Sequence, residues 1–267
     1  MFKMSALAGV MILSTALWAA DNELTPAEKK AGWILLFDGK SFAHWDDPTK
    51  RTPPGDSFVI EDGCLKSTSH PKITEDLFSA DTYGDFELVW DWKISPKGNS
   101  GLKYRIQDHV FLPDVRVPRF EPNVNAALQN RRTDRPAKGQ DYVIGFEYQM
   151  TDNATNSDAM RNGKLHQTAA LYDIFPPVKD ATKAIGEFNQ SRLVARVGHV
   201  EHWLNGERVM EGSLQAPDVA ASMAKRWGEG SAVYELLVKQ PVKACHISLQ
   251  NHDDVAWFKN IKIRRMP

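Results

Sequence analysis

The chain has 267 residues, of which 42% are hydrophobic and 25% are charged, and its formal net charge is −1. This length and composition predict a globular protein with a real core, built as one large domain or two ordinary ones. Without a basic stripe, the sequence argues against nucleic acid as a partner. Eight Trp and six Tyr supply flat side chains, which serve as sugar platforms in some proteins and as core residues in others.

The first 20 residues have the pattern of a signal peptide. Lys3 is positively charged, residues 6–18 are apolar, and Ala19 and Ala20 offer a small-residue cleavage region. The apolar run is too short for a confident membrane span. We therefore expect residues 1–20 to be removed and residues 21–267 to form one domain without a transmembrane segment. The mature protein is then expected in the periplasm or outside the cell.

Cys64 and Cys245 are the two cysteines of the chain. In an exported protein they can pair, or they can remain as two buried thiols, and spacing does not decide between these states. Two cysteines are too few for a thiolate metal cluster.

Short elements separated by turn signals follow one another along the chain. Thr25, Pro26 and Glu28 predict a short capped helix. The dipeptides 62–63 (Asp-Gly) and 205–206 (Asn-Gly) are typical of two-residue hairpin turns. A second short helix is expected within residues 220–230, and long loops over residues 108–140 and 153–190. Strands are predicted over residues 33–37, 58–60, 64–65, 86–94, 102–106, 143–152, 192–197, 200–204, 207–210, 246–250 and 255–263.

Many short alternating strands and little helix predict an all-β sandwich or barrel. The common nucleotide-binding, serine-hydrolase and zinc-protease motifs do not occur in the sequence. Functions as a nucleotide-binding protein, a serine hydrolase or a zinc protease therefore lose the motif support that usually identifies them.

The strand over residues 143–152 organises the rest of the chain. Side chains alternate along a strand, so Phe146, Tyr148 and Met150 share an apolar face while Glu147 and Gln149 lie on the other. A carboxylate inside an otherwise buried strand is costly unless it is paired or used. Either Glu147 belongs to a site, or this face is simply the solvated side of a sheet.

Several motifs, in order from about residue 32 to the end, resemble the 3-keto-disaccharide hydrolase domain family. They cover residues 33–40 (WILLFDGK), 99–101 (NSG), 145–152 (GFEYQMTD), 186–189 (GEFN), 199–206 (HVEHWLNG), 249–252 (LQNH) and 258–261 (FKNI). The resemblance implies a concanavalin A-like jelly-roll β-sandwich of two curved antiparallel sheets. It also implies an exported protein that acts on sugars whose carbon 3 has become a ketone.

The chain departs from the family pattern at two points. Asp253 and Asp254 stand where relatives often have a Gly after the His of the penultimate motif. Phe188 stands where they often have Trp. These changes concern local contacts rather than the fold.

A jelly roll of this kind has one open, concave face, which would gather the polar residues of several strands. The alternative is that these residues line a solvated convex face. The residues expected together are Lys103, Arg105, Glu147, Gln149, Ser248, Gln250 and His252.

The chemistry of a 3-keto-glycoside suits such a groove. A base removes the acidified proton on carbon 2, and the resulting enolate expels the group on carbon 1; water can then add back. This needs a base tuned toward neutral pH and a cation or donor at the enolate oxygen. Glu147 is the expected base or metal ligand, and Lys103 and Arg105 are expected to face the developing charge. His166 is an acid, base or ligand, or else a solvated loop residue.

Other candidates concern substrate binding. Tyr172 and Trp203 are sugar platforms or packing residues, and Asp152 and Asn189 are possible hydroxyl partners. His202 shares its strand face with apolar residues, which favours a core position. Asn99 and Asn205 are interpreted as turn residues. The complete expected substrate-binding set is Gln149, Asp152, Tyr172, Asn189, Trp203, Gln250 and His252.

No cofactor is certain. A divalent metal is possible, held by Glu147, His166 and one further His or carboxylate. Two other functions stay open: a carbohydrate-binding module without chemistry, and an ordinary glycoside hydrolase. The second needs two acids about 5–10 Å apart, for which Glu147 with Asp152 or Glu201 could serve.

Overall fold

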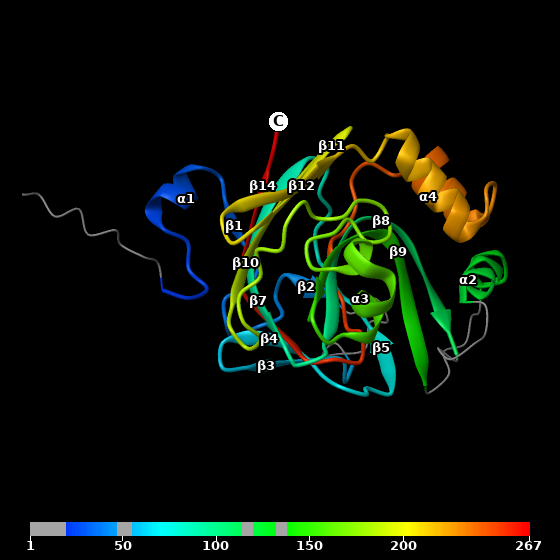
Figure 1. The fold of residues 1–267 in the computed structure, drawn as a ribbon. Coiled ribbons are helices and arrows are strands. Elements are labelled where there is room, and N and C mark those ends of the chain that lie inside the picture. Colours follow the sequence, from blue (N-terminus) through cyan, green and yellow to red (C-terminus); the bar gives the residue numbers. More distant parts are fainter. Residues whose placement is uncertain (1–19, 47–54, 114–119, 132–137) are drawn as a thin grey trace, which may run out of the picture.

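The computed structural model describes residues 20–46, 55–113, 120–131 and 138–267. Two sheets pack face to face, and their strands are antiparallel except for one pair (Figure 1). The predicted all-β jelly-roll sandwich is confirmed. The expected signal peptide falls almost wholly outside the described residues.

The strands of the first sheet, in spatial order, are β12 (Glu207–Gly212), β11 (His199–Leu204), β10 (Asn189–Arg196), β7 (Phe86–Ile94), β14 (Ala256–Arg265), β4 (Cys64–Ser67) and β3 (Phe58–Glu61), with β1 (Ile34–Leu35) also paired to β14. Those of the second are β2 (Trp45–Asp46), β6 (Leu77–Ser79), β13 (Ser248–Leu249), β8 (Asn99–Leu112), β9 (Gly139–Thr151) and β5 (Ile73–Glu75). The helical segments are α1 (Pro26–Lys30), α2 (Phe120–Gln129), α3 (Ser157–Asn162), η1 (Gly163–His166), α4 (Pro217–Trp227), α5 (Ala232–Tyr234) and η2 (Glu235–Lys239).

Aromatic side chains fill the space between the sheets. Trp90 of β7 meets Tyr148 of β9 edge-on, with ring centroids 5.0 Å apart. His202 of β11 is fully buried beside them; its ring nitrogens bond the Tyr104 hydroxyl and the Ala169 carbonyl, each at 3.0 Å. Burial lowers the pKa of His202 to about 3, so the ring is neutral at physiological pH. The expected core position of His202 is confirmed.

Local signals placed several elements correctly. Thr25 and Glu28 form the reciprocal capping box of α1, and Asn205 lies at positive φ in the turn between β11 and β12. The expected loop over residues 108–140 was wrong in part. β8 continues to Leu112, β9 begins at Gly139, and the described part between them contains α2. Both strands are long because each is the other's main partner.

Helices α2 and α4 lie on the side of β8 and β9 that faces away from the first sheet (Figure 1). This face of the second sheet is therefore roofed rather than open. In the described part of the chain, no helix combines the length and apolar character that crossing a membrane requires.

Candidate active site

A cavity of about 390 Å³ lies on the roofed face of the second sheet. Glu147 and Gln149 of β9 form part of its floor, and Gln250 and His252 lie on the segment after β13. Four of the expected groove residues therefore do come together. The described residues that line it are Thr74, Asn99, Phe120, Gln140, Tyr142, Glu147, Gln149, Tyr172, Arg226, Gln250, His252 and Asp253.

The side chain of Glu147 is half-buried, and protein surrounds its carboxyl group on most sides. This enclosure raises its pKa to about 7, against the opposing effects of the Lys103 and Arg226 cations. The carboxylates of Asp76 and Asp158 also raise the pKa of Glu147, by a smaller amount than burial does. A carboxyl group with this pKa can accept and return a proton near neutral pH.

A glycine makes room for this carboxylate. Glu147 leans over Gly101 of β8, so that a Cβ at residue 101 would lie 2.6 Å from its Oε1 atom. From the other side, Nε2 of Gln250 approaches Oε2 of Glu147 at 3.5 Å. The carboxylate is thus held over β8 at a fixed place in the cavity.

Lys103 lies directly opposite Glu147 in the β8–β9 ladder but does not reach the cavity. Its Nζ lies 3.4 Å from Oδ2 of Asp76, both side chains are buried, and Ser248 donates a 2.9 Å hydrogen bond to the same oxygen. Burial alone would lower the pKa of Lys103, but the carboxylates of Asp76 and Glu147 together raise it. Lys103 is therefore a buried cation beneath Glu147, and it lines a small hollow next to the cavity together with Glu147, Tyr172 and Arg226.

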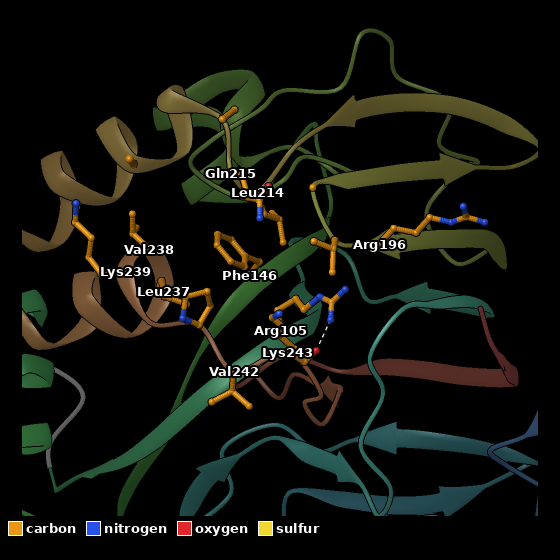
Figure 2. Close-up of a pocket in the computed structure, with 15 residues that line it drawn as sticks. Arg105, Phe146, Arg196, Leu214, Gln215, Leu237, Val238, Lys239, Val242 and Lys243 are labelled. Carbon is orange, nitrogen blue, oxygen red and sulfur yellow. Dashed lines mark hydrogen bonds between the residues drawn. The ribbon is translucent and has the colours of Figure 1, made fainter. Parts of the chain in front are cut away.

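Arg105 does not join this site. The β8–β9 register shifts between Tyr104 and Asp108, and Arg105 adopts a φ of 51°. The guanidinium donates to Oδ1 of Asp85 at 2.9 Å and to the carbonyl of Lys243, in a second cavity of about 370 Å³ (Figure 2). The expected shared face of Lys103 and Arg105 was wrong, because a bulge breaks the alternation on which it depended.

His166 lies outside the cavity lining. Its Nδ1 bonds Oδ2 of Asp158 at 2.8 Å and its Nε2 faces Oδ1 of Asp173 at 3.5 Å. Burial opposes the charged form, but the two carboxylates outweigh it and raise the pKa of His166 to about 9. His166 supports Tyr172 through Asp158, because the Tyr172 hydroxyl donates to Asp158 at 3.1 Å and the Tyr172 ring lines the cavity.

Three other expected substrate contacts lie elsewhere. Asp152 accepts backbone N–H groups of Lys97, at 2.9 Å, and of the following turn, and so holds a loop together. Asn189 accepts from the Lys183 backbone, also at 2.9 Å. The Trp203 indole, which donates to Glu201 at 2.7 Å, is stacked with Arg192. In the part of the chain that the structure describes, none of these three lines the Glu147 cavity.

The two carboxylates considered as partners of Glu147 in a paired-acid hydrolase are both engaged elsewhere. Asp152 is engaged as described, and Glu201 lies with His199 and Arg208 on the outer side of β11. His199, Glu201 and Glu211 are the one described group of three potential ligand side chains within reach of a single ion. Arg208 contacts both carboxylates of that group, which offsets their charge. Glu147 and His166 do not form such a group with a third described side chain.

Sequence reasoning did not predict Arg226. The residue lies near the end of α4, and its guanidinium packs over the Tyr172 ring, 5.4 Å from the centroid. Glu121 of α2 and Asp173 each lie 3.7 Å from it. A basic residue in the last turn of a helix is common for reasons of the helix dipole alone, so its position in the sequence gave no signal.

A buried acid with a pKa near neutrality, beside cations and aromatic rings in a roofed cavity, defines an enzyme-like site on a β-sandwich. Residues 32–264 match the family model of the 3-keto-alpha-glucoside-1,2-lyase-like domain. The chain belongs to this family.

Individual relatives agree with this membership. The chain is 31% identical over 245 residues to a Bacteroides thetaiotaomicron protein named 3-keto-disaccharide hydrolase, covering 87% of this chain and 78% of the relative. A solved Parabacteroides distasonis structure, titled as a candidate glycosyl hydrolase, superposes with a TM-score of 0.70 at 26% identity, covering 93% of this chain and 100% of the other. A second one from the same organism shares the fold at 21% identity and a TM-score of 0.55, covering 88% and 99%.

Proposed function

We propose that this protein is an exported enzyme that cleaves 3-keto-glycosides by removing the proton on carbon 2 and eliminating the group on carbon 1. The observation that carries the proposal is Glu147, a carboxyl group with a pKa of about 7 at the floor of a roofed polar cavity. Family membership supports the substrate class, because the similar Bacteroides protein is named a 3-keto-disaccharide hydrolase. The signal-peptide pattern of residues 1–20 supports export.

In the first step, the Glu147 carboxylate takes the proton from carbon 2. The electron pair of the broken C–H bond moves into a carbon 2–carbon 3 double bond, and the ketone oxygen becomes negative. The enolate then reforms the ketone while its carbon 2 electron pair becomes a carbon 1–carbon 2 double bond and expels the carbon 1 substituent with its bonding pair; the substituent leaves as an alcohol after gaining a proton. Addition of water, with hydroxyl to carbon 1 and a proton to carbon 2, completes a net hydrolysis.

The cavity also suits the rest of a sugar. Tyr142, Tyr172 and Phe120 supply flat faces, and Gln149, Gln250 and His252 supply polar groups for hydroxyls. Arg226 and Lys103 favour the charged form of Glu147. Without them, burial would hold the proton on Glu147 to a still higher pH and leave less active base at pH 7.

The test compares purified protein acting on a 3-keto-glucoside and on its parent glucoside, each with and without a chelator. We expect cleavage of the keto sugar alone, a loss of at least about 10²-fold in Glu147→Gln, and wild-type behaviour in Glu201→Gln. The second variant removes a carboxylate on the outer side of β11. Cleavage of the parent glucoside would favour a paired-acid hydrolase, and tight binding without cleavage would favour a binding module.

A further inference from the structure

Asn99 is a buried amide that the fold does not use. The residue is 5% exposed, and its Oδ1 atom is enclosed without a hydrogen-bond partner. Among the described residues, its side-chain nitrogen makes no hydrogen bond either, although Asn99 lines the Glu147 cavity. Buried amides are normally satisfied, and an unsatisfied one costs stability. The expected turn role was wrong: Asn99 is the first residue of β8, paired with Thr151.

The neighbouring Asn251 shows what a structural amide looks like in this protein. It is 1% exposed, its Nδ2 donates to the carbonyls of Ser57 and Thr68 at 2.8 and 3.0 Å, and its Oδ1 accepts from the Asp253 backbone at 2.8 Å. Both amides are buried and close to the same cavity. The fold satisfies one completely and leaves the other unsatisfied.

The backbone around Asn99 is nevertheless held firmly. Its N–H donates to Oδ2 of Asp254 at 2.9 Å, and the adjacent Ser100 hydroxyl donates to the carbonyl of Gln250 at 2.8 Å. The side chain is thus presented from a fixed position. Because Oδ1 is enclosed, the NH2 group is the end that a molecule in the cavity can reach.

Asn99 also lies at a suitable distance from the base. Asn99, Gly101 and Lys103 alternate along the same face of β8, and the Glu147 carboxylate leans over Gly101. One further step of two residues along a strand covers about 7 Å. This gap accommodates a contact of about 3 Å from the carboxylate to carbon 2 and another from the ketone oxygen to an N–H donor.

Three other donors near Glu147 are already engaged. Arg226 lies between Glu121 and Asp173, Lys103 is paired with Asp76, and the Gln250 Nε2 atom faces Glu147 itself. The charges also argue against a divalent ion held by Asn99 and Glu147, because both Lys103 and Arg226 act on the same carboxylate as cations. A neutral N–H donor aimed at an oxygen of the substrate meets neither difficulty.

We propose that Asn99 is a further catalytic residue, whose side-chain NH2 donates to the oxygen on carbon 3 as the ketone becomes an enolate. The inference rests on the proposed function. It gives the side-chain NH2 of Asn99, which has no hydrogen-bond partner among the described residues, a hydrogen bond in the state in which charge develops on that oxygen.

The test uses Asn99→Leu, which keeps the shape and removes the amide, with Asn251→Leu as the matched control for stability. We expect Asn99→Leu to keep or raise the melting temperature, because it removes an unsatisfied polar group. Asn251→Leu should lower it. On a 3-keto-glucoside, Asn99→Leu should lower kcat by about 10²–10³-fold, the usual effect of losing one such donor, with KM nearly unchanged.

Three outcomes would overturn the inference while leaving the proposed function intact. These are an active wild type with kcat within twofold in Asn99→Leu, a rise in KM alone, and a melting temperature that drops as far as in Asn251→Leu. Activity of the wild type that depends on added Mn²⁺ and is lost with Asn99 would instead identify a metal ligand. A wild type inactive on every 3-keto-glucoside would remove the proposed function, and the inference with it.

Discussion

Glu147 shows how burial turns an ordinary side chain into a base for neutral pH. Its pKa is raised from the ordinary glutamate value of 4.5 to about 7 because the charged form loses solvent, and nearby cations recover only part of that loss. The reactive form is the carboxylate. Its population, and therefore the rate, should depend strongly on pH in the physiological range.

We expect kcat/KM for a 3-keto-glucoside to rise about tenfold per pH unit below pH 7 and to level off above it. Steady-state kinetics from pH 5 to pH 8.5 measure this limb. In Lys103→Met the limb should move to higher pH, because the cation beneath Glu147 lowers its pKa. A limb near pH 4.5 in the wild type would show that Glu147 is not the titrating base.

The position of the Glu147 carboxylate depends on the absence of a side chain at Gly101. In Gly101→Ala the new methyl group would meet the Glu147 carboxylate, which can move because it is the end of a flexible side chain. We expect stability to change little and kcat/KM to fall by about 10²-fold, the effect of a displacement of about 1 Å at a reacting group. Gly84→Ala, where nothing lies within 4 Å, is the control and should match the wild type. Equal activity in both variants would contradict the assigned position of the carboxylate.

At the scale of elements, the segment from α3 to residue 175 is built around a charged histidine. His166 of η1 lies between Asp158 of α3 and Asp173, and this arrangement places the Tyr172 ring against the cavity. The segment is anchored to the sheet through the backbone of Glu147, whose carbonyl accepts from Tyr172 at 3.0 Å. Charge on His166 therefore stabilises an element of the site without taking part in the chemistry.

The pKa of His166 is raised from the ordinary histidine value of 6.5 to about 9 in the folded protein. Its contribution to stability is fully present below about pH 6.5 and is lost as the pH rises through 9. We expect the melting temperature of the wild type to fall between pH 7.5 and pH 9.5, and that of His166→Gln to stay level there. The titration of Glu147 does not account for a change in this pH range, because it is centred near pH 7. A parallel fall in the variant would assign the transition to another group.

Element prediction succeeded where local chemistry decides the structure. The capping box of α1, the two hairpin turns and the apolar alternation of β7 were all legible in the sequence, because each depends on residues close together in the chain. The prediction from the sequence was wrong at the bulge in β8 and at α2. A bulge is decided by the partner strand, and α2 packs not only on β8 but also on α4 and α5, which lie far along the chain.

At the scale of the whole molecule, polar side chains of the second sheet reach two separate cavities. The Glu147 cavity lies under α2 and α4, whereas Arg105 lies in the second cavity with Phe146 and the segment after η2 (Figure 2). The cysteines are separated in a similar way. Cys64 lies in β4 of the first sheet. Cys245 lies just before β13, where its backbone forms an isolated β-bridge with Tyr83.

Both thiols are free and buried, and burial raises the pKa of each. We expect the melting temperature to be unchanged by a reductant, because no cross-link constrains the unfolded chain. Both thiols should be slow to alkylate in the native protein and fully alkylated in denaturant without prior reduction. A purified protein with no titratable thiol in denaturant would show that the two cysteines pair.

The sequence by itself determined the sandwich, the core face of β9 and the prominence of Glu147, because alternation along a strand is a local property of the chain. It also carried the family resemblance. Only the tertiary structure decided which polar residues share a cavity. Lys103 lies beneath the site, Arg105 was moved out by a bulge, Arg226 was brought in by a distant helix, and the Oδ1 atom of Asn99 was left buried without a hydrogen-bond partner among the described residues. These outcomes depend on contacts between segments far apart in the chain, which no local pattern contains.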